Sequence, residues 1–267
     1  MKIGLFSPKQ VGDTAHHNDM KTALITGASS GIGWATALLL SKQGFRLVIC
    51  GRRQNKLQAL SEALETPHQI LTFDVRKRQE VFDAIERLEA PFNTIDLLVN
   101  NAGNAHGLDP AHEASLDDWE AMIDGNVKGL LYVTKALLPQ MIARKNGQII
   151  NVGSIAGKEA YPKGNVYCAS KAAVDRFTEG LRLDCNPFGI RIGAIHPGLV
   201  ATEFSEVRFK GDQPRAASVY AKLQALTAAD VAQAIAYMVA APAHVTIADL
   251  TILPTDQASA YVVNRNT

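Results

Sequence analysis

Apolar residues in this chain fall into short runs, which are separated by longer segments in which apolar positions recur every three or four residues. Runs rich in β-branched residues predict strands. These runs are 22–26, 46–50, 69–73, 95–99, 147–152, 190–195 and 245–252. The segments between them have helical spacing, for example 116–143 and 228–241, and a capping-box-like sequence, Ser115 to Asp118, opens the first.

The alternation of strands and helices predicts an α/β fold: a single-domain, Rossmann-like, doubly wound parallel sheet of about seven strands with helices on both faces. Strands that are apolar on both faces support burial of the whole sheet. No long linker, repeat or low-complexity segment divides residues 20–267, so we expect one domain there. Residues 1–19 contain one apolar run, which is shorter than the about 7–15 residues of a signal peptide. We interpret them as a flexible N-terminal arm or an upstream extension of the true start.

The composition excludes several classes of protein. Hydrophobic residues make up 47% of the 267 residues and charged residues 20%, so a core is available. The formal net charge of +1 gives no basic field for nucleic acid, and no apolar run of about 18 residues predicts a membrane span. Three scattered cysteines indicate reduced thiols and a cytoplasmic protein, and no His or Cys spacing predicts a metal site.

A glycine-rich turn, TGASSGIG, follows the first predicted strand and precedes a helix. Its glycines let the backbone approach a pyrophosphate at the helix N-terminus, where amide donors favour anions. The candidate cofactor-binding residues of this turn are Gly27, Ser29, Ser30, Gly31, Ile32 and Gly33. The alternative is a tight strand–helix turn without a ligand.

The end of the second strand indicates which dinucleotide would bind. An NAD site places an acidic residue about 20 residues past the glycines, on the ribose 2′-hydroxyl. This chain has Arg52 and Arg53 there instead, and guanidinium groups suit the 2′-phosphate of NADP. The alternative is that both arginines are solvated loop charges.

Three further motifs follow the fourth, fifth and sixth strands: NNAG from Asn100, NVGS ending at Ser154, and HPGLVATEF from His196. With Tyr167 and Lys171, four residues apart, this order of motifs resembles the short-chain dehydrogenase/reductase family over residues 20–252. The segments GRRQNKLQAL, PAHEASLDDWEAMIDGN and GLVATEFSEVRFKGD are similar to bacterial NADP-dependent 3-hydroxy acid dehydrogenases. That subgroup is described as acting on serine, L-allo-threonine and malonic semialdehyde.

The resemblance implies a catalytic set of Asn126, Ser154, Tyr167 and Lys171. A free phenol has a pKa of about 10, so Tyr167 needs help to act as a base near neutrality. The ammonium of Lys171, one helical turn on, is expected to lower that pKa and to hold the nicotinamide ribose. Ser154 would bind the substrate oxygen, and Asn126 would hold a water that relays protons. Further cofactor contacts implied by the resemblance are Asp74, Val75, Asn101, Ala102, Gly103, Pro197, Gly198, Val200 and Thr202.

A long stretch, GLVATEFSEVRFKGD, follows the sixth strand and is predicted to be an irregular lid over the substrate. A 3-hydroxy acid offers a carboxylate, and Arg208 is the candidate that would bind it bidentately. Lys210 is a weaker candidate because its charge is a point charge. The alternative is that Arg208 is a solvated lid charge.

Two rival functions stay open. One is another reductase of the same family, such as a 3-oxoacyl-carrier-protein reductase. The other is a nucleotide-sensing protein that has lost catalysis, although such proteins usually lack the Tyr or Lys. Family habit implies a homotetramer or a dimer, with residues 258–267 a candidate extension onto a neighbour.

Overall fold

The computed structural model describes residues 20–265, so the arm expected over residues 1–19 lies outside the described residues. The main sheet contains β1 (Thr22–Thr26), β2 (Arg46–Gly51), β3 (His68–Thr72), β4 (Leu97–Asn100), β5 (Gln148–Val152), β6 (Arg191–Pro197) and β9 (Asp249–Ile252). The longer helices are α1 (Gly31–Lys42), α2 (Gln54–Ser61), α3 (Arg78–Glu86), α4 (Leu116–Ile123), α5 (Gly129–Arg144), α6 (Asn165–Cys185) and α9 (Ala228–Ala240). Short elements are η1 (Asp124–Lys128), η2 (Ile155–Gly157), η3 (Asn186–Phe188), β7 (Val200–Ala201), α7 (Phe204–Arg208), α8 (Gln213–Ser218) and β8 (Leu226–Thr227).

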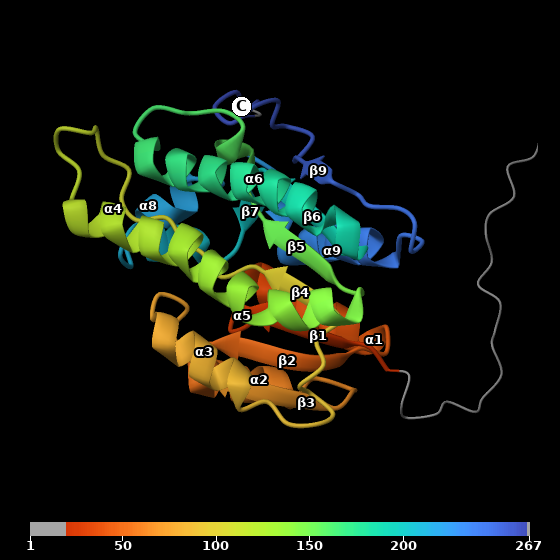
Figure 1. Ribbon diagram of the computed structural model, residues 1–267. Coiled ribbons are helices and arrows are strands. Elements are labelled where there is room, and N and C mark those ends of the chain that lie inside the picture. The colour runs from red at the N-terminus through yellow and green to blue at the C-terminus, as the bar shows by residue number, and fades with distance from the viewer. Residues whose placement is uncertain (1–19, 266–267) are drawn as a thin grey trace, which may run out of the picture.

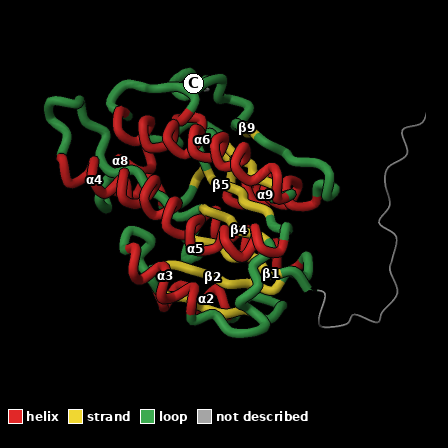
Figure 2. Tube along the Cα trace, in the orientation of Figure 1, coloured by secondary structure: helices red, strands yellow, loops and turns green. Residues whose placement is uncertain are grey.

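The seven strands of the main sheet are parallel and lie in the order β3-β2-β1-β4-β5-β6-β9, with helices on both faces (Figures 1 and 2). One core cluster joins the sheet to α3, α5 and α6, and a second joins it to α1, α2 and α9. The predicted doubly wound fold is therefore confirmed. The chain runs outward from β1 in both directions, so a crevice opens between the carboxyl ends of β1 and β4, where ligands of such sheets bind.

The segment predicted as one helix over 116–143 is interrupted. Between α4 and α5 lies a π-helical segment, η1, that contains Asn126. Such segments occur mostly as single turns inside α-helices and often at functional sites. The capping box expected at the start of α4 is not formed, because the Ser115 side chain makes no cap hydrogen bond. A capping box is formed at the start of α9 instead. There the Thr227 side chain accepts a hydrogen bond from the Asp230 backbone, and the Asp230 side chain accepts one from the Thr227 backbone.

Two other expectations about local structure need correction. The last strand begins at Asp249 rather than at Val245, because Val245 donates its backbone N–H to Pro242 in a turn. The stretch after β6 is not irregular throughout, since it contains β7 and α7 and ends at Asp212, the residue before α8. Asp212 accepts a hydrogen bond from the Arg215 backbone and thereby caps α8. Within residues 20–265, no helix has the length and apolar character that crossing a membrane requires.

Candidate active site

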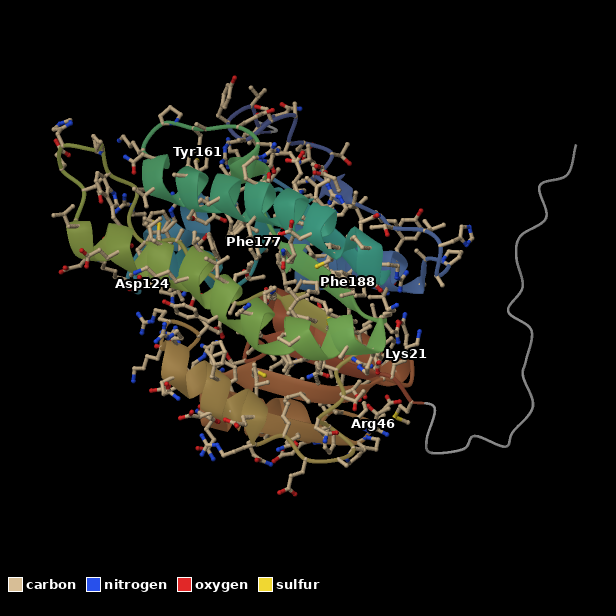
Figure 3. All side chains as sticks on the ribbon, viewed as in Figure 1. Lys21, Arg46, Asp124, Tyr161, Phe177 and Phe188 are labelled. Atoms are coloured by element: carbon tan, nitrogen blue, oxygen red, sulfur yellow. The ribbon has the colours of Figure 1, made fainter. Side chains whose placement is uncertain are left out.

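A cavity of about 620 Å³ opens at the carboxyl ends of the strands, within the size range of small-molecule and cofactor sites. Its walls are the glycine-rich turn, the loops that follow β2 to β6, and the segment of α7. In Figure 3, Asp124 and Tyr161 lie at this end of the molecule. Lys21 and Arg46, where β1 and β2 begin, lie at the opposite end.

Nearly all predicted site residues line this cavity, although they are spread over more than 180 positions of the sequence. Of the cofactor, catalytic and substrate candidates, only Gly33, Asn126 and the weaker substrate candidate Lys210 are absent from its lining. Gly33 lies behind the turn, where an added Cβ would stand 2.5 Å from the Gly27 carbonyl oxygen. Its role is therefore close packing of α1 on the turn rather than contact with a ligand.

Hydrogen bonds fix the glycine-rich turn to the loop after β4. The Thr26 hydroxyl accepts hydrogen bonds from the backbone N–H groups of Asn101 and Ala102, each at 3.0 Å. The Asn101 amide donates to the carbonyls of Thr26 and Gly27. Gly27 has a φ of 66°, a left-handed conformation that favours glycine. This part of the cavity is therefore held mainly by backbone groups.

The two arginines after β2 have different surroundings. Arg53 donates to the hydroxyls of Ser29 and Ser30, and its Nη1 lies 2.8 Å from the Glu203 carboxylate. Arg52 is more exposed, and its Nη1 lies 3.9 Å from Asp74. Both line the cavity beside the glycine-rich turn, where they can bind a phosphate on the adenosine ribose.

Asp74, which was predicted to contact the cofactor, is engaged with Arg76. Burial alone would raise the pKa of Asp74, but hydrogen bonds and charge from Arg76 outweigh burial and lower it. The Asp74 carboxylate also accepts a hydrogen bond from the Arg76 backbone, as a residue that begins a turn does. Arg76 itself lines the cavity and adds a third guanidinium to those of Arg52 and Arg53, which follow β2.

Ser154, Tyr167 and Lys171 lie together on the floor of the cavity. Tyr167 and Lys171 are one turn apart on α6 and are almost fully buried. Lys171 donates from Nζ to the Val152 carbonyl at 2.9 Å, at the end of β5. Burial lowers the pKa of Lys171 to about 8, a change that Asp175 opposes.

Burial raises the pKa of Tyr167, and the neighbouring Tyr161 raises it further. A hydrogen bond with Ser154 and the charge of Arg208 act in the opposite direction. The pKa of Tyr167 is therefore raised overall, whereas the sequence led us to expect that Lys171 would lower it. The physical reason is that removing a phenolate from water costs more than the nearby groups return.

Asn126 uses its side chain to hold a loop. Its Oδ1 accepts from the Asn104 backbone at 2.7 Å, and its Nδ2 donates to the Asn104 carbonyl and to the Ser170 hydroxyl. These hydrogen bonds hold the loop that contains Gly103 and Asn104 close to the Lys171 ammonium. Both ends of the Asn126 side-chain amide are therefore engaged within the protein.

Arg208 enters the cavity from α7 and faces aromatic rings. Its guanidinium carbon lies 5.7 Å from the Tyr161 ring centre and 5.8 Å from that of Tyr167. Nε donates to the Gly107 carbonyl at 2.9 Å. Among residues 20–265, no carboxylate forms an ion pair with Arg208. Lys210, the weaker candidate, instead pairs with Asp118 at 3.0 Å and does not line the cavity.

Several lining residues were missed by sequence reasoning. The main ones come from loops and from the C-terminal segment, and they are Arg76, Asn104, His106, Tyr161, Glu203, Phe204, Tyr220, Gln257 and Ala260. Gln257 is an example: it accepts a hydrogen bond from the Leu199 backbone, 58 positions away. No local pattern marks such residues, because the fold brings them in from a distance. Within residues 20–265, no group of His, Cys, Asp and Glu side chains has the arrangement of a metal site.

The family model of short chain dehydrogenases matches residues 21–213. The NADP-dependent 3-hydroxy acid dehydrogenase YdfG of Escherichia coli (strain K12) is 46% identical over 238 residues, which cover 89% of this chain and 96% of that protein. A sulfoacetaldehyde reductase 2 of Chromohalobacter salexigens is 43% identical over 91% of this chain and 98% of that protein. A solved structure of the closed form of serine dehydrogenase complexed with NADP+ has a TM-score of 0.88 at 44% identity, and the match covers 92% of this chain and 100% of that one.

The fold and the site thus define a nucleotide-dependent oxidoreductase of the doubly wound α/β class. The chain belongs to the short chain dehydrogenase family, as its sequence motifs predicted.

Proposed function

We propose that this protein is an NADP-dependent oxidoreductase that interconverts short 3-hydroxy acids and their 3-oxo acids. Serine, allo-threonine and malonic semialdehyde represent the substrate class. Both the reaction and the cofactor are supported by the similarity to the Escherichia coli NADP-dependent 3-hydroxy acid dehydrogenase and to the serine dehydrogenase complexed with NADP+. The observation on this chain that supports an acid as the substrate is the position of the Arg208 guanidinium over the Tyr167 ring.

The chain's own residues fit a cofactor of this kind. The glycine-rich turn would receive the pyrophosphate at the N-terminus of α1. Arg52 and Arg53 would bind the 2′-phosphate, and Lys171 would hold the nicotinamide ribose. When bound, the cofactor accepts or donates the hydride.

Proton transfer falls to Tyr167, because its hydroxyl interacts with Ser154 at the floor of the cavity. Ser154 would hydrogen-bond the substrate oxygen as its charge changes. Lys171, bound to the Val152 carbonyl, stands behind them as the nearby positive charge. Asn126 keeps the loop of Asn104 in place, and the backbone of η1 would hold the water through which protons reach solvent.

Arg208 supplies the selectivity for acids. The half-buried Arg208 guanidinium pairs with no carboxylate among residues 20–265, so it is a suitable site for a substrate anion. Its Nε is engaged by the Gly107 carbonyl, and its guanidinium carbon lies 5.7 Å from the Tyr161 ring centre and 5.8 Å from that of Tyr167. The same arrangement suits a sulfonate.

Reduction of a short sulfonated aldehyde is therefore a second candidate function. The sulfoacetaldehyde reductase relative supports it at 43% identity. A sulfonate has three oxygens and a larger radius than a carboxylate, so the two substrate classes should differ in KM rather than in kcat.

The test is a steady-state comparison of Arg208→Met with the unmutated enzyme. Loss of a charge-assisted bond should raise KM for 3-hydroxy acids about 10- to 100-fold. Turnover of a neutral secondary alcohol should stay nearly unchanged. Lys210→Met is the matched control, because it removes one positive charge from the same segment outside the cavity. Equal losses for charged and neutral substrates would mean that Arg208 only holds α7 in place.

A substrate panel separates the rival functions. NADPH oxidation with malonic semialdehyde, sulfoacetaldehyde and an acetoacetyl thioester distinguishes the acid reductases from a carrier-protein reductase. Absence of turnover with all three, together with intact NADPH binding, would support a nucleotide-sensing protein. We further propose a cytoplasmic homo-oligomer, a tetramer or a dimer, which sedimentation of the purified protein would test.

A further inference from the structure

A cluster of charged side chains lies outside the cavity, behind Ser154 and Lys171. It contains Lys158, which follows η2, Asp175 of α6, His196 of β6 and Asp249 of β9. None of the four lines the cavity, and none belongs to the predicted catalytic set. His196 is 1% exposed and the Asp175 side chain 8%. Burying such groups is costly unless they stabilise one another.

Asp175 is at the centre of this cluster. Its Oδ1 lies 3.3 Å from His196 Nδ1, and its Oδ2 lies 3.9 Å from Lys158 Nζ. On the far side of the imidazole, His196 Nε2 lies 3.2 Å from Asp249 Oδ2. Asp249 also accepts a hydrogen bond from Lys158 Nζ. Two carboxylates thus alternate with one ammonium and one imidazole.

The cluster touches both elements that carry the reaction. Asp175 follows Lys171 by one turn of α6, and its charge acts on that ammonium. His196 packs against Gly153, the residue before Ser154, so closely that an added Cβ would stand 2.6 Å from Nδ1. Lys171 binds the carbonyl of Val152. The end of β5 is therefore held between Lys171 on one side and His196 on the other.

We propose that Asp175 and His196 are positioning residues for the reaction: His196 packs behind Gly153 and so fixes Ser154 and the end of β5, and Asp175 lies between that imidazole and the turn of α6 that carries Lys171. The inference rests on the proposed function, which gives Lys171 and Ser154 their roles. It adds a determinant of the pH range in which the enzyme works.

The direction of the pH effect follows from the charges. Burial lowers the pKa of Lys171 to about 8, and the Asp175 carboxylate opposes that lowering. Burial raises the pKa of Asp175, and the positive charges of His196 and Lys158 oppose that rise. Asp249 and, on its own helix, Arg176 also face this carboxylate. The groups that face His196 are the Asp175 and Asp249 carboxylates, the Lys158 ammonium and the Ser154 backbone. Removing the Asp175 charge should therefore let Lys171 lose its proton at a lower pH.

The test is the pH profile of kcat/KM for Asp175→Asn in 3-hydroxy acid oxidation. The alkaline limb should move down by about one pH unit, the lower end of the pKa shift that a nearby opposite charge causes. Glu179→Gln is the matched control: it removes one negative charge from an exposed position of the same helix, where Glu179 pairs with Arg176. Its profile should match the unmutated enzyme. An unmoved limb in Asp175→Asn would overturn the proposal.

His196→Gln provides a second, independent measurement. It should lower kcat several-fold with KM nearly unchanged, and its effect should shrink in the Asp175→Asn background, because residues that act as a unit are not additive. Unchanged kcat, or fully additive effects, would contradict the proposal. A purely structural role would instead lower the fraction of protein that binds NADPH, and fluorescence titration measures that fraction.

The pH dependence of NADPH affinity separates failure of this inference from failure of the proposed function. If the enzyme turns over none of the 3-hydroxy acids, the proposed function is wrong. NADPH affinity would still weaken at a lower pH in Asp175→Asn than in Glu179→Gln, since Lys171 holds the ribose as an ammonium. Identical NADPH profiles for the two variants would overturn the positioning role.

Discussion

The two halves of the cavity are built in different ways. The half next to β1, β2 and β4 is held mainly by backbone groups and short polar side chains, such as the bonds of Thr26 to Asn101 and Ala102. The half next to α7 is held by long side chains from distant segments. Arg208, for example, reaches a carbonyl 101 positions away.

This difference follows from what each half recognises. A pyrophosphate is bound by amide donors at a helix N-terminus, which need a particular backbone path and therefore glycine. A small acid is bound by one cation at a particular place, and that cation can come from any segment that reaches it. The two halves meet in two places, at Tyr167 on the floor and at the Arg53–Glu203 ion pair on the rim.

The largest effect is expected at Tyr167, and it would separate chemistry from cofactor binding. Tyr167→Phe removes only the hydroxyl, so kcat should fall by about 10²- to 10⁴-fold, the contribution of a positioned acid–base group. The dissociation constant for NADP should stay within a few-fold, because the glycine-rich turn and both arginines are intact. Stopped-flow turnover and fluorescence titration measure the two quantities. Tyr161→Phe, in the same cavity, is the control, and an unchanged kcat in Tyr167→Phe would disprove the acid–base role.

The same contrast explains how much the sequence could predict. The sheet and most of the cofactor half follow from local patterns: apolar runs for strands, glycines after the first strand, arginines after the second. Arg208 was found because it lies in the long stretch after β6. Tyr161, Glu203 and Gln257 were not found, because each acquires its role through contacts with distant residues. The π-helical turn at Asn126 was also missed, since helical periodicity does not distinguish it from an α-helix.

The second effect concerns the arginines of the cofactor half. Replacing Arg52 and Arg53 together with alanine should reduce the preference for NADP over NAD in kcat/KM by about 10- to 100-fold, since charge-assisted hydrogen bonds contribute about 1.5–3 kcal/mol each. Lys56→Ala is the control, because this exposed cation is near Glu203 but does not line the cavity. Equal kcat/KM values for NAD and NADP in the unmutated enzyme would contradict the assignment of both arginines.

The third effect tests whether the cofactor half depends on close backbone packing. In Gly33→Ala, the added Cβ would stand 2.5 Å from both the Gly27 carbonyl oxygen and the Asn101 amide nitrogen. We expect a loss of about 1–3 kcal/mol in the free energy of unfolding, as overpacking causes. Gly180→Ala in α6, where nothing lies within 4 Å of an added Cβ, should instead stabilise by about 0.5–1 kcal/mol. Urea denaturation measures both, and a neutral Gly33→Ala would show that the turn adapts easily.

The smallest effect, on NADPH affinity, is expected at the Arg53–Glu203 ion pair, where the two halves of the cavity meet. Glu203 precedes α7 and holds Arg53 Nη1 at 2.8 Å, while Arg53 Nη2 lies 2.7 Å from the Ser30 hydroxyl. A 2′-phosphate that binds this guanidinium either competes with Glu203 or shares Arg53 with it. In both cases the carboxylate repels the phosphate, and the ion pair is half-exposed, so its energy is modest.

Glu203→Gln keeps the shape of the side chain and removes its charge. We expect NADPH to bind roughly fivefold more tightly, in line with an exposed ion pair of at most about 1 kcal/mol. NADH, which lacks the 2′-phosphate, should bind as before. Glu206→Gln, an exposed acid within α7, controls for the net charge of the segment. If NADPH and NADH affinities instead changed together, Glu203 would act by holding α7 closed, and the two halves of the cavity would be coupled through the position of that helix rather than through competition for Arg53.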